Sequence, residues 1–156
     1  MNTFITNSSN RNLKNRLTEL ISKSKELKFL TGFFYFSGIN ELYESLKSKP
    51  EMQINILVGL NADRIVHGLV GYADNSLVEY ADNEKKLSDK EKFERFKKSI
   101  SVSINSDNFD TQYFDQQIRF FINLIKQDRL RIRKTFDPNH AKLFLFKIED
   151  DLKKAL

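Results

Sequence analysis

The chain has 156 residues, of which 40% are hydrophobic and 12% aromatic, and these values predict a single domain with its own core rather than a disordered chain. It contains no cysteine, which excludes disulfides and thiolate metal ligands, and no apolar run of the roughly 20 residues that a membrane helix needs. The N-terminus lacks a secretory signal pattern, so we expect a soluble protein located in the cytoplasm.

The first four predicted elements alternate between helix and strand. Leucine and isoleucine residues at spacings of three, four and seven predict an amphipathic helix over residues 10–28. The run FLTGFFYF at 29–36 predicts a strand covered on both faces, and its aromatic side chains are better explained as core than as a platform for stacked bases. A helix over 39–48 and a strand over 52–59 follow, and this order predicts an α/β domain.

The pattern loosens from residue 61 to about 110, and over about 75–110 we expect an insertion or lid on the core rather than a separate domain. An apolar stripe then predicts a helix over 111–126. Two strands, 129–134 and 140–148, complete the predicted sheet, and a turn that contains proline joins them.

The positive charge of the chain is concentrated near its end. Residues 126–147 contain seven basic and two acidic residues, which accounts for the whole net charge of +5. Such a field attracts nucleic acids and other phosphate groups, and a solvated basic surface is the alternative explanation. The candidate phosphate-binding residues are Arg129, Arg131, Arg133 and Lys134.

Three of these residues alternate along one predicted strand, so their guanidinium groups share a face. Guanidinium groups bind phosphate oxygens in pairs. If strands 129–134 and 140–148 pair through the turn, the three arginines line the approach to His140. Otherwise, exposed arginines on an edge strand serve only to prevent edge-to-edge aggregation.

One of the two histidines lies two residues before a lysine. In a strand, His140 and Lys142 project to the same face, while Leu143 and Leu145 face the opposite way, into packing. A neutral imidazole can attack a phosphodiester while the ammonium group offsets charge on the non-bridging oxygens. The triplet also occurs by chance, and His67, which has no comparable partner, is interpreted as a surface or packing residue.

Several familiar motifs for cofactor binding and for catalysis are absent from the sequence. It contains no phosphate-binding glycine loop, no dinucleotide fingerprint and no serine-nucleophile elbow. Two histidines without cysteine leave no convincing set of zinc ligands. We therefore expect no cofactor and no metal site.

NHAKLFLF, preceded by the basic strand RLRIRK, resembles the His-x-Lys strand of the phospholipase D superfamily. FLTGFFYFSGINELYESL followed by INILVGL resembles the opening of phospholipase D-like domains found at the N-terminus of bacterial helicases and in related restriction nucleases. The resemblance covers most of the chain and is weakest over residues 75–110. It implies a phospholipase D-like α/β domain, a mixed sheet flanked by helices, over residues 1–156.

In that family two His-x-Lys motifs meet in one active site. One histidine becomes a covalent phosphohistidine, the other protonates the leaving oxygen, and both lysines hold the phosphate without a metal. The resemblance implies that His140 is the nucleophile or general acid and Lys142 the phosphate clamp, in phosphodiester hydrolysis of nucleic acid, DNA in particular. Because the chain has one motif, it also implies a homodimer, and it implies a helicase motor on the same full-length chain.

The family pattern has an aspartate five residues after the lysine, where this chain has Lys147, and a Gly-Ser-x-Asn segment after the strand. We therefore expect a truncated domain whose continuation beyond Leu156 is missing. The main alternative is a non-catalytic module of the same fold that positions DNA through its basic residues. A phospholipid hydrolase fits less well, because no apolar segment is suited to face a membrane.

Overall fold

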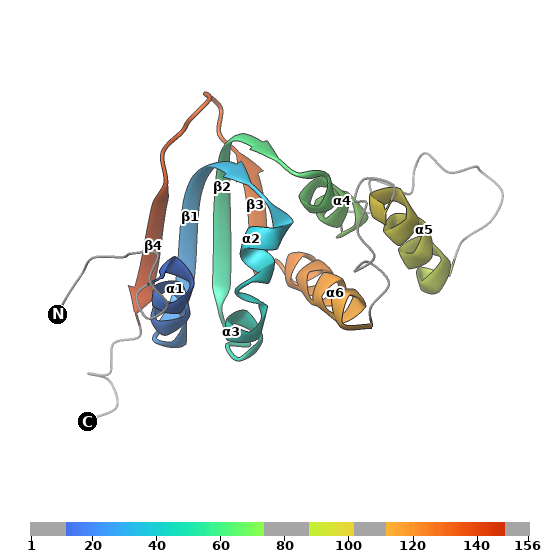
Figure 1. Cartoon of the computed structure of the whole chain (residues 1–156), viewed down its shortest axis with the longest axis horizontal. Helices are drawn as coiled ribbons and strands as arrows, with labels where there is room; N and C mark the ends of the chain where they lie inside the picture. The colour runs from blue at the N-terminus through green and yellow to red at the C-terminus, as the bar shows by residue number, and fades with distance from the viewer. Residues whose placement is uncertain (1–11, 74–87, 102–111, 149–156) are drawn as a thin grey trace.

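A computed structural model describes residues 12–73, 88–101 and 112–148. In chain order the described elements are α1 (Leu13–Ser22), β1 (Ser24–Phe34), α2 (Phe36–Asn40), α3 (Tyr43–Lys47), β2 (Gln53–Ala62), α4 (Arg64–Ala73), α5 (Asp89–Ser101), α6 (Gln112–Lys126), β3 (Leu130–Lys134) and β4 (Leu143–Ile148). They form one small domain of mixed α/β architecture around an open, mixed sheet of four strands (Figure 1).

The strand order in the sheet is β3-β2-β1-β4. β1, β2 and β3 run parallel to one another, and β4 pairs antiparallel with β1. The last two strands do not pair, since β3 and β4 lie at opposite edges, so the condition under which the arginines would line the approach to His140 is not met. The eight residues 135–142 join β3 to β4 over the ends of β2 and β1. Eight extended residues reach about 26 Å, and three strand spacings need only about 14 Å.

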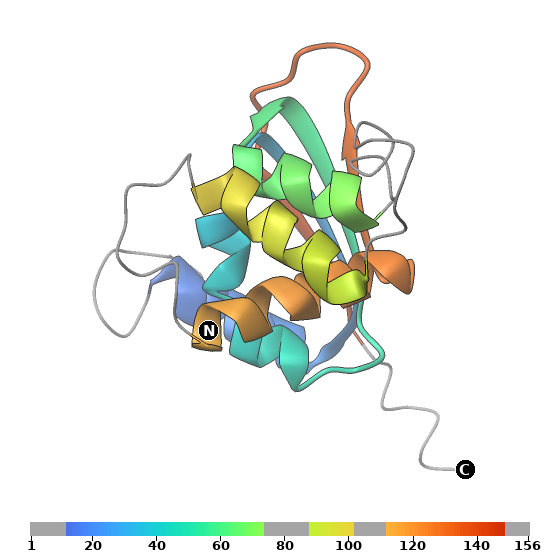
Figure 2. The same cartoon turned by 90° about the vertical axis from the view of Figure 1, so that its right-hand side faces the viewer.

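The helices gather on one side of the sheet and past its β3 edge, with α5 outermost, as Figures 1 and 2 show together. This arrangement covers one face of the sheet. The side chains of β1 and β2 that point into this face are buried, and they are Leu27, Phe29, Ile54, Ile56 and Val58.

The opposite face of the sheet is open among the described residues. Leu57 is 40% exposed, and Leu143 and Leu145 of β4 are 47% and 51% exposed. The prediction that both faces of the first strand are covered is therefore wrong for the described part, as is the predicted packing of these two β4 leucines. The register of β4 decides which of its side chains face the helices. Phe144 lies opposite Phe29, with ring centroids 4.7 Å apart, so the residues on either side of it, Leu143 and Leu145, point to the open face.

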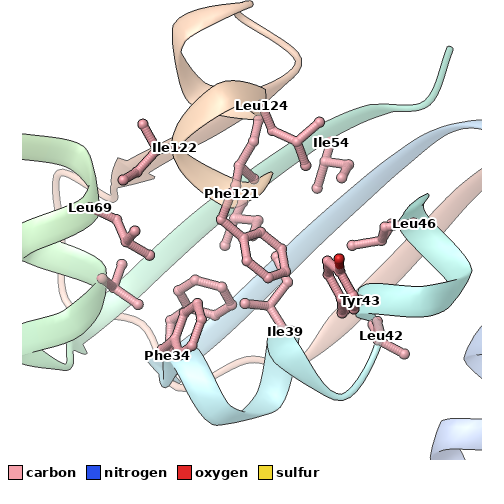
Figure 3. Packing of buried hydrophobic residues seen from close by; sticks show 14 of the residues in the cluster. Phe34, Ile39, Leu42, Tyr43, Leu46, Ile54, Leu69, Phe121, Ile122 and Leu124 are labelled. Carbon is pink, nitrogen blue, oxygen red and sulfur yellow. The ribbon is translucent and has the colours of Figure 1, made fainter. Parts of the chain in front are cut away.

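The core lies between the sheet and the helices, where Figure 3 shows Phe121 among side chains from α2, α3 and β2. Its ring meets Phe36 edge to face, with centroids 5.5 Å apart. Phe121 and Ile118 are fully buried, so the helix predicted from the apolar stripe is confirmed as α6. The helix predicted over 39–48 is instead two short helices, α2 and α3.

The first helix ends earlier than its periodicity predicts. α1 stops at Ser22, and β1 begins at Ser24, whose Oγ donates a 2.7 Å hydrogen bond to the carbonyl of Leu20. From Glu26 onward the chain pairs with β2 and β4 at once. Pairing on both sides supplies a full set of backbone hydrogen bonds, which outweighs the helical pattern of the side chains.

α5 falls within residues 75–110, where we expected an insertion or lid, and the rest of that segment lies outside the described residues. Phe93 of α5 is buried in the main hydrophobic cluster, and the guanidinium carbon of Arg119 on α6 lies 3.6 Å from the centre of its ring. Lys97 and Asp115 form a 2.9 Å ion pair between the same two helices. In the part of the chain that the structure describes, no helix combines the length and hydropathy needed to cross a membrane.

Candidate functional site

His140 and Lys142 lie in the connection of residues 135–142, which runs over the carboxyl ends of β2 and β1 (Figure 1). Both side chains are exposed. The prediction that this histidine belongs to the last strand is wrong, because β4 begins at Leu143. The two side chains are therefore placed by the path of the connection, and not by the alternation of a strand.

Hydrogen bonds hold the connection to the end of β2. The amide of Thr135 donates to the carbonyl of Val58 at 2.9 Å, and the amide of Asn139 donates to the carbonyl of Gly59 at 3.2 Å. Asn139 then turns the chain toward β4, since its Oδ1 accepts a 2.7 Å hydrogen bond from the amide of Ala141. These contacts fix the backbone on both sides of His140.

Two glycines make room for the connection. A Cβ atom on Gly59 would lie 1.9 Å from the carbonyl oxygen of Asn139, a distance that no side chain allows. A Cβ atom on Gly32 would lie 3.3 Å from the same oxygen and 3.6 Å from Nδ1 of His140. The register of β1 and β2 shifts between Thr31 and Phe33, the place where Gly32 lies. The imidazole therefore rests on the carboxyl end of β1, over a residue without a side chain.

The aromatic run 33–36, which extends from the end of β1 into α2, divides between core and surface. Phe34 and Phe36 are buried, whereas Phe33 is 49% exposed and Tyr35 is 55% exposed. The exposed pair is near parallel, with ring centroids 6.5 Å apart and an interplanar angle of 20°. The edge-on contact between Phe33 and His140 has a centroid distance of 6.1 Å. The prediction that the whole run is core is therefore half wrong. Alternation of neighbouring residues within FFYF was the signal that could have found this pair.

Arg129 does not belong to the same surface as the other basic residues. It precedes β3, and its Nη2 donates a 3.2 Å hydrogen bond to the carbonyl of Lys49, which lies before the amino end of β2. Its Nε is buried and has no hydrogen-bond partner among the described residues. This arginine is a structural tie at the end of the sheet opposite to His140.

Arg131 and Arg133 lie on the open face of the sheet, where a groove of about 400 Å³ is lined by both guanidinium side chains, Lys28 and apolar residues of β1, β2 and β4. Arg131 is held by Asp128, with Nε 2.6 Å from Oδ1 and Nη2 on Oδ2. This hydrogen-bonded pair raises the pKa of Arg131 and lowers the pKa of Asp128. The groove is a second candidate surface: Arg131 and Arg133 were predicted to share a face and bind phosphate, but the groove that they line was not predicted.

The predicted row of arginines beside His140 is therefore not formed. Arg131 pairs in register with Asn55 and Arg133 with Leu57 of β2, so a whole strand separates them from β1. Lys134, at the carboxyl end of β3, is exposed and lies directly before the connection.

Within the described ranges, no three His, Asp or Glu side chains are grouped closely enough to hold a metal ion. His67 is exposed on α4, as its interpretation as a surface residue predicts. Comparisons of the chain with protein-family models, with curated protein sequences and with solved structures gave no match.

Proposed function

We propose that this chain is a phospholipase D-like domain that hydrolyses phosphodiester bonds of nucleic acid through His140 and Lys142, without a metal. The observation that carries the proposal is the position of these two exposed side chains, on a connection held across the carboxyl ends of two parallel strands. Open α/β sheets bind their ligands at this edge. The resemblance of NHAKLFLF and of the β1–β2 region to phospholipase D-like domains supports the same assignment, and with it a place beside a helicase motor or in a restriction nuclease.

In the proposed reaction, Nε2 of His140 attacks phosphorus, because Nδ1 lies on the side of Gly32. A phosphorus–nitrogen bond forms, the bond from phosphorus to the leaving oxygen breaks, and that oxygen takes a proton from a second histidine. In the second step the second histidine accepts a proton from water. The water oxygen attacks phosphorus, the phosphorus–nitrogen bond breaks, and a phosphomonoester leaves. The ammonium group of Lys142 offsets charge on the non-bridging oxygens in both steps.

The second histidine is assigned to another copy of the chain. The sequence contains a single His-x-Lys motif, and a two-fold axis beside the connection would bring two of them together. The exposure of His140 and Lys142 leaves both free to meet their symmetry mates.

The experiment is a phosphodiesterase assay in EDTA on labelled single- and double-stranded DNA. We expect His140→Ala to abolish turnover and Lys142→Ala to reduce it by about 100-fold or more, on the order of what a transition-state hydrogen-bond donor contributes. His67→Ala is the matched control, because it removes the other histidine from an exposed position on α4 and should leave turnover unchanged.

Loss of wild-type activity in EDTA, or equal activity of His140→Ala, would contradict the metal-free histidine mechanism. A folded wild type that binds DNA without cutting it, with affinity that survives His140→Ala, would instead favour a module that positions DNA. The groove lined by Arg131 and Arg133 supports this second candidate. A module that positions DNA predicts that DNA affinity depends steeply on salt concentration and that Arg133→Ala binds DNA more weakly. Unchanged affinity of Arg131→Ala would argue against phosphate binding by the basic strand.

A further inference from the structure

Phe33 and Tyr35 expose their rings at the carboxyl end of β1, beside His140. The transfer of aromatic side chains out of water is favourable. Two half-exposed rings on a backbone fixed by hydrogen bonds are therefore a candidate binding surface. The neighbours of this pair in sequence, Phe34 and Phe36, are buried. The core therefore does not use the exposed pair.

The backbone under both rings is held in place. The carbonyl of Phe33 accepts a 2.9 Å hydrogen bond from Oγ1 of Thr31, and the residue pairs with Asn61 of β2. The carbonyl of Tyr35 accepts a 3.0 Å hydrogen bond from the amide of Gly38 in α2. A surface held in this way loses little conformational freedom when it binds a flat ligand.

The surroundings of the pair favour an anionic partner. Lys134 precedes the connection on the β3 side and Lys142 ends it on the β4 side, and both are exposed. Asp137 is the one acidic residue of the connection, and the carboxylate of Asp63, which lies next to the pair, accepts hydrogen bonds from the amides of Phe36 and Val66. Lys142 lies two residues after His140, which contacts Phe33, whereas Lys134 lies beyond β2. Two near-parallel rings and a cation on the same connection as His140 match the two parts of a nucleotide, because bases stack on aromatic faces and phosphates pair with cations.

We infer that Phe33 and Tyr35 form a stacking platform for an unpaired base next to His140, so that the substrate is a single-stranded nucleic acid. This inference rests on the proposed function, in either its hydrolytic or its binding form. A base inside a duplex cannot stack on the platform, because its neighbours in the duplex cover both of its faces. The platform would place the base while the phosphate beside it reaches His140 and Lys142.

The test compares three probes: a labelled single-stranded oligodeoxynucleotide, an abasic strand of equal length that carries the same phosphates, and a duplex. Affinities are measured in the His140→Ala background, which removes turnover. We expect Phe33→Ala and Tyr35→Ala each to weaken binding of the base-containing single strand by about 5- to 150-fold, the effect of losing one stacked base. Affinity for the abasic strand and for the duplex should not change.

Tyr113→Ala is the matched control. Tyr113 is also half exposed, but it contacts Tyr43 of α3 and Glu44, on the side of the domain from which β2 starts. Its loss should leave all three affinities unchanged.

A second measurement uses the absence of tryptophan from the chain. Tyr35→Trp and Tyr113→Trp each introduce a single tryptophan, whose indole emission is followed. A base-containing strand should quench the fluorescence of the first variant and not of the second, because stacking on a base quenches indole emission.

The outcomes separate the platform from the function on which it rests. If the parent protein binds none of the probes, the proposed function and the platform both fail. If it binds DNA, and Phe33→Ala and Tyr35→Ala bind as tightly as the parent with no quenching in Tyr35→Trp, the platform alone is overturned. Equal loss of affinity for the base-containing and abasic strands, together with a shift from dimer to monomer, would also overturn it and identify the rings as a contact between protomers.

Discussion

The carbonyl oxygen of Asn139 occupies the space in which a side chain at Gly59 would begin, only 1.9 Å from the position of a Cβ atom. The amide of the same asparagine donates to the carbonyl of this glycine at 3.2 Å. The site thus depends on a residue of β2 that carries no functional group. The glycine has an ordinary backbone conformation, so space alone accounts for the requirement.

Gly59→Ala should displace the connection and lower both stability and activity. We expect a loss of about 2–3 kcal/mol in the free energy of unfolding, in the range of overpacked sites, together with lower affinity for single-stranded DNA. Gly32→Ala should cost less, because its nearest contact would be 3.3 Å. Urea denaturation measures the stability. Gly38→Ala is the control, since no atom lies within 4 Å of its Cβ position and alanine favours the helix by about 0.5–1 kcal/mol. A Gly59→Ala protein as stable as the wild type would contradict the close approach of Asn139.

Arg129 and Arg133 should respond differently to mutation. Arg129→Ala should lower stability by about 1–2 kcal/mol, because it removes the hydrogen bond to Lys49 and the packing of the aliphatic stem. It should leave DNA affinity unchanged. Arg133→Ala should lower DNA affinity and leave stability unchanged if the groove binds phosphate. The slope of log affinity against log salt should then fall by about one. Thermal unfolding and salt titration of DNA binding give the two readouts, and a larger affinity loss in Arg129→Ala would contradict its assignment as a structural tie.

The ion pair of Asp128 and Arg131 should produce a pH-dependent contribution to stability. Hydrogen bonding to Arg131 lowers the pKa of the Asp128 carboxyl below its ordinary value of 3.8. The contribution is therefore fully present above pH 3.8 and is lost as the pH falls through the lower folded-state pKa. The stability difference between wild type and Arg131→Met should be constant near neutral pH and shrink in acid. In this variant the Asp128 titration followed by NMR should move back toward its ordinary pKa, and an unmoved midpoint would show that the pair does not form in solution.

Asp63 joins the ends of β1 and β2 through its two carboxylate oxygens. Oδ1 accepts from the amide of Val66 at 2.9 Å, which caps α4, and Oδ2 accepts from the amide of Phe36 at 2.8 Å. Asp63→Ala should cost about 2 kcal/mol, and Asp63→Asn about half as much, since an amide retains one acceptor oxygen. Hydrogen exchange at the Phe36 amide provides a local readout. Unchanged protection in Asp63→Ala would rule out this hydrogen bond.

Local periodicity was enough to find the strands and the long helix α6, but it missed α4, which lies where the pattern loosens. The stripe of α6 and the β-branched run of β2 are confirmed, because each pattern arises from residues that are neighbours in sequence. Periodicity was misleading at residues 24–28, where the apolar spacing continued although the chain had already entered β1. The side chains there follow a helical pattern, but the backbone hydrogen bonds come from β2 and β4.

Composition and motifs identify the chemical groups that the domain offers, with His140, Lys142 and a basic segment as its distinctive features. The arrangement of the strands in the folded domain then sets where these groups lie. The pairing of β1 with both β2 and β4 sends the connection over Gly59 and Gly32, places His140 beside Phe33, and leaves the arginines on another surface. The physical reason is that strand order results from competition among segments far apart in the chain, and no local pattern records which of them pair.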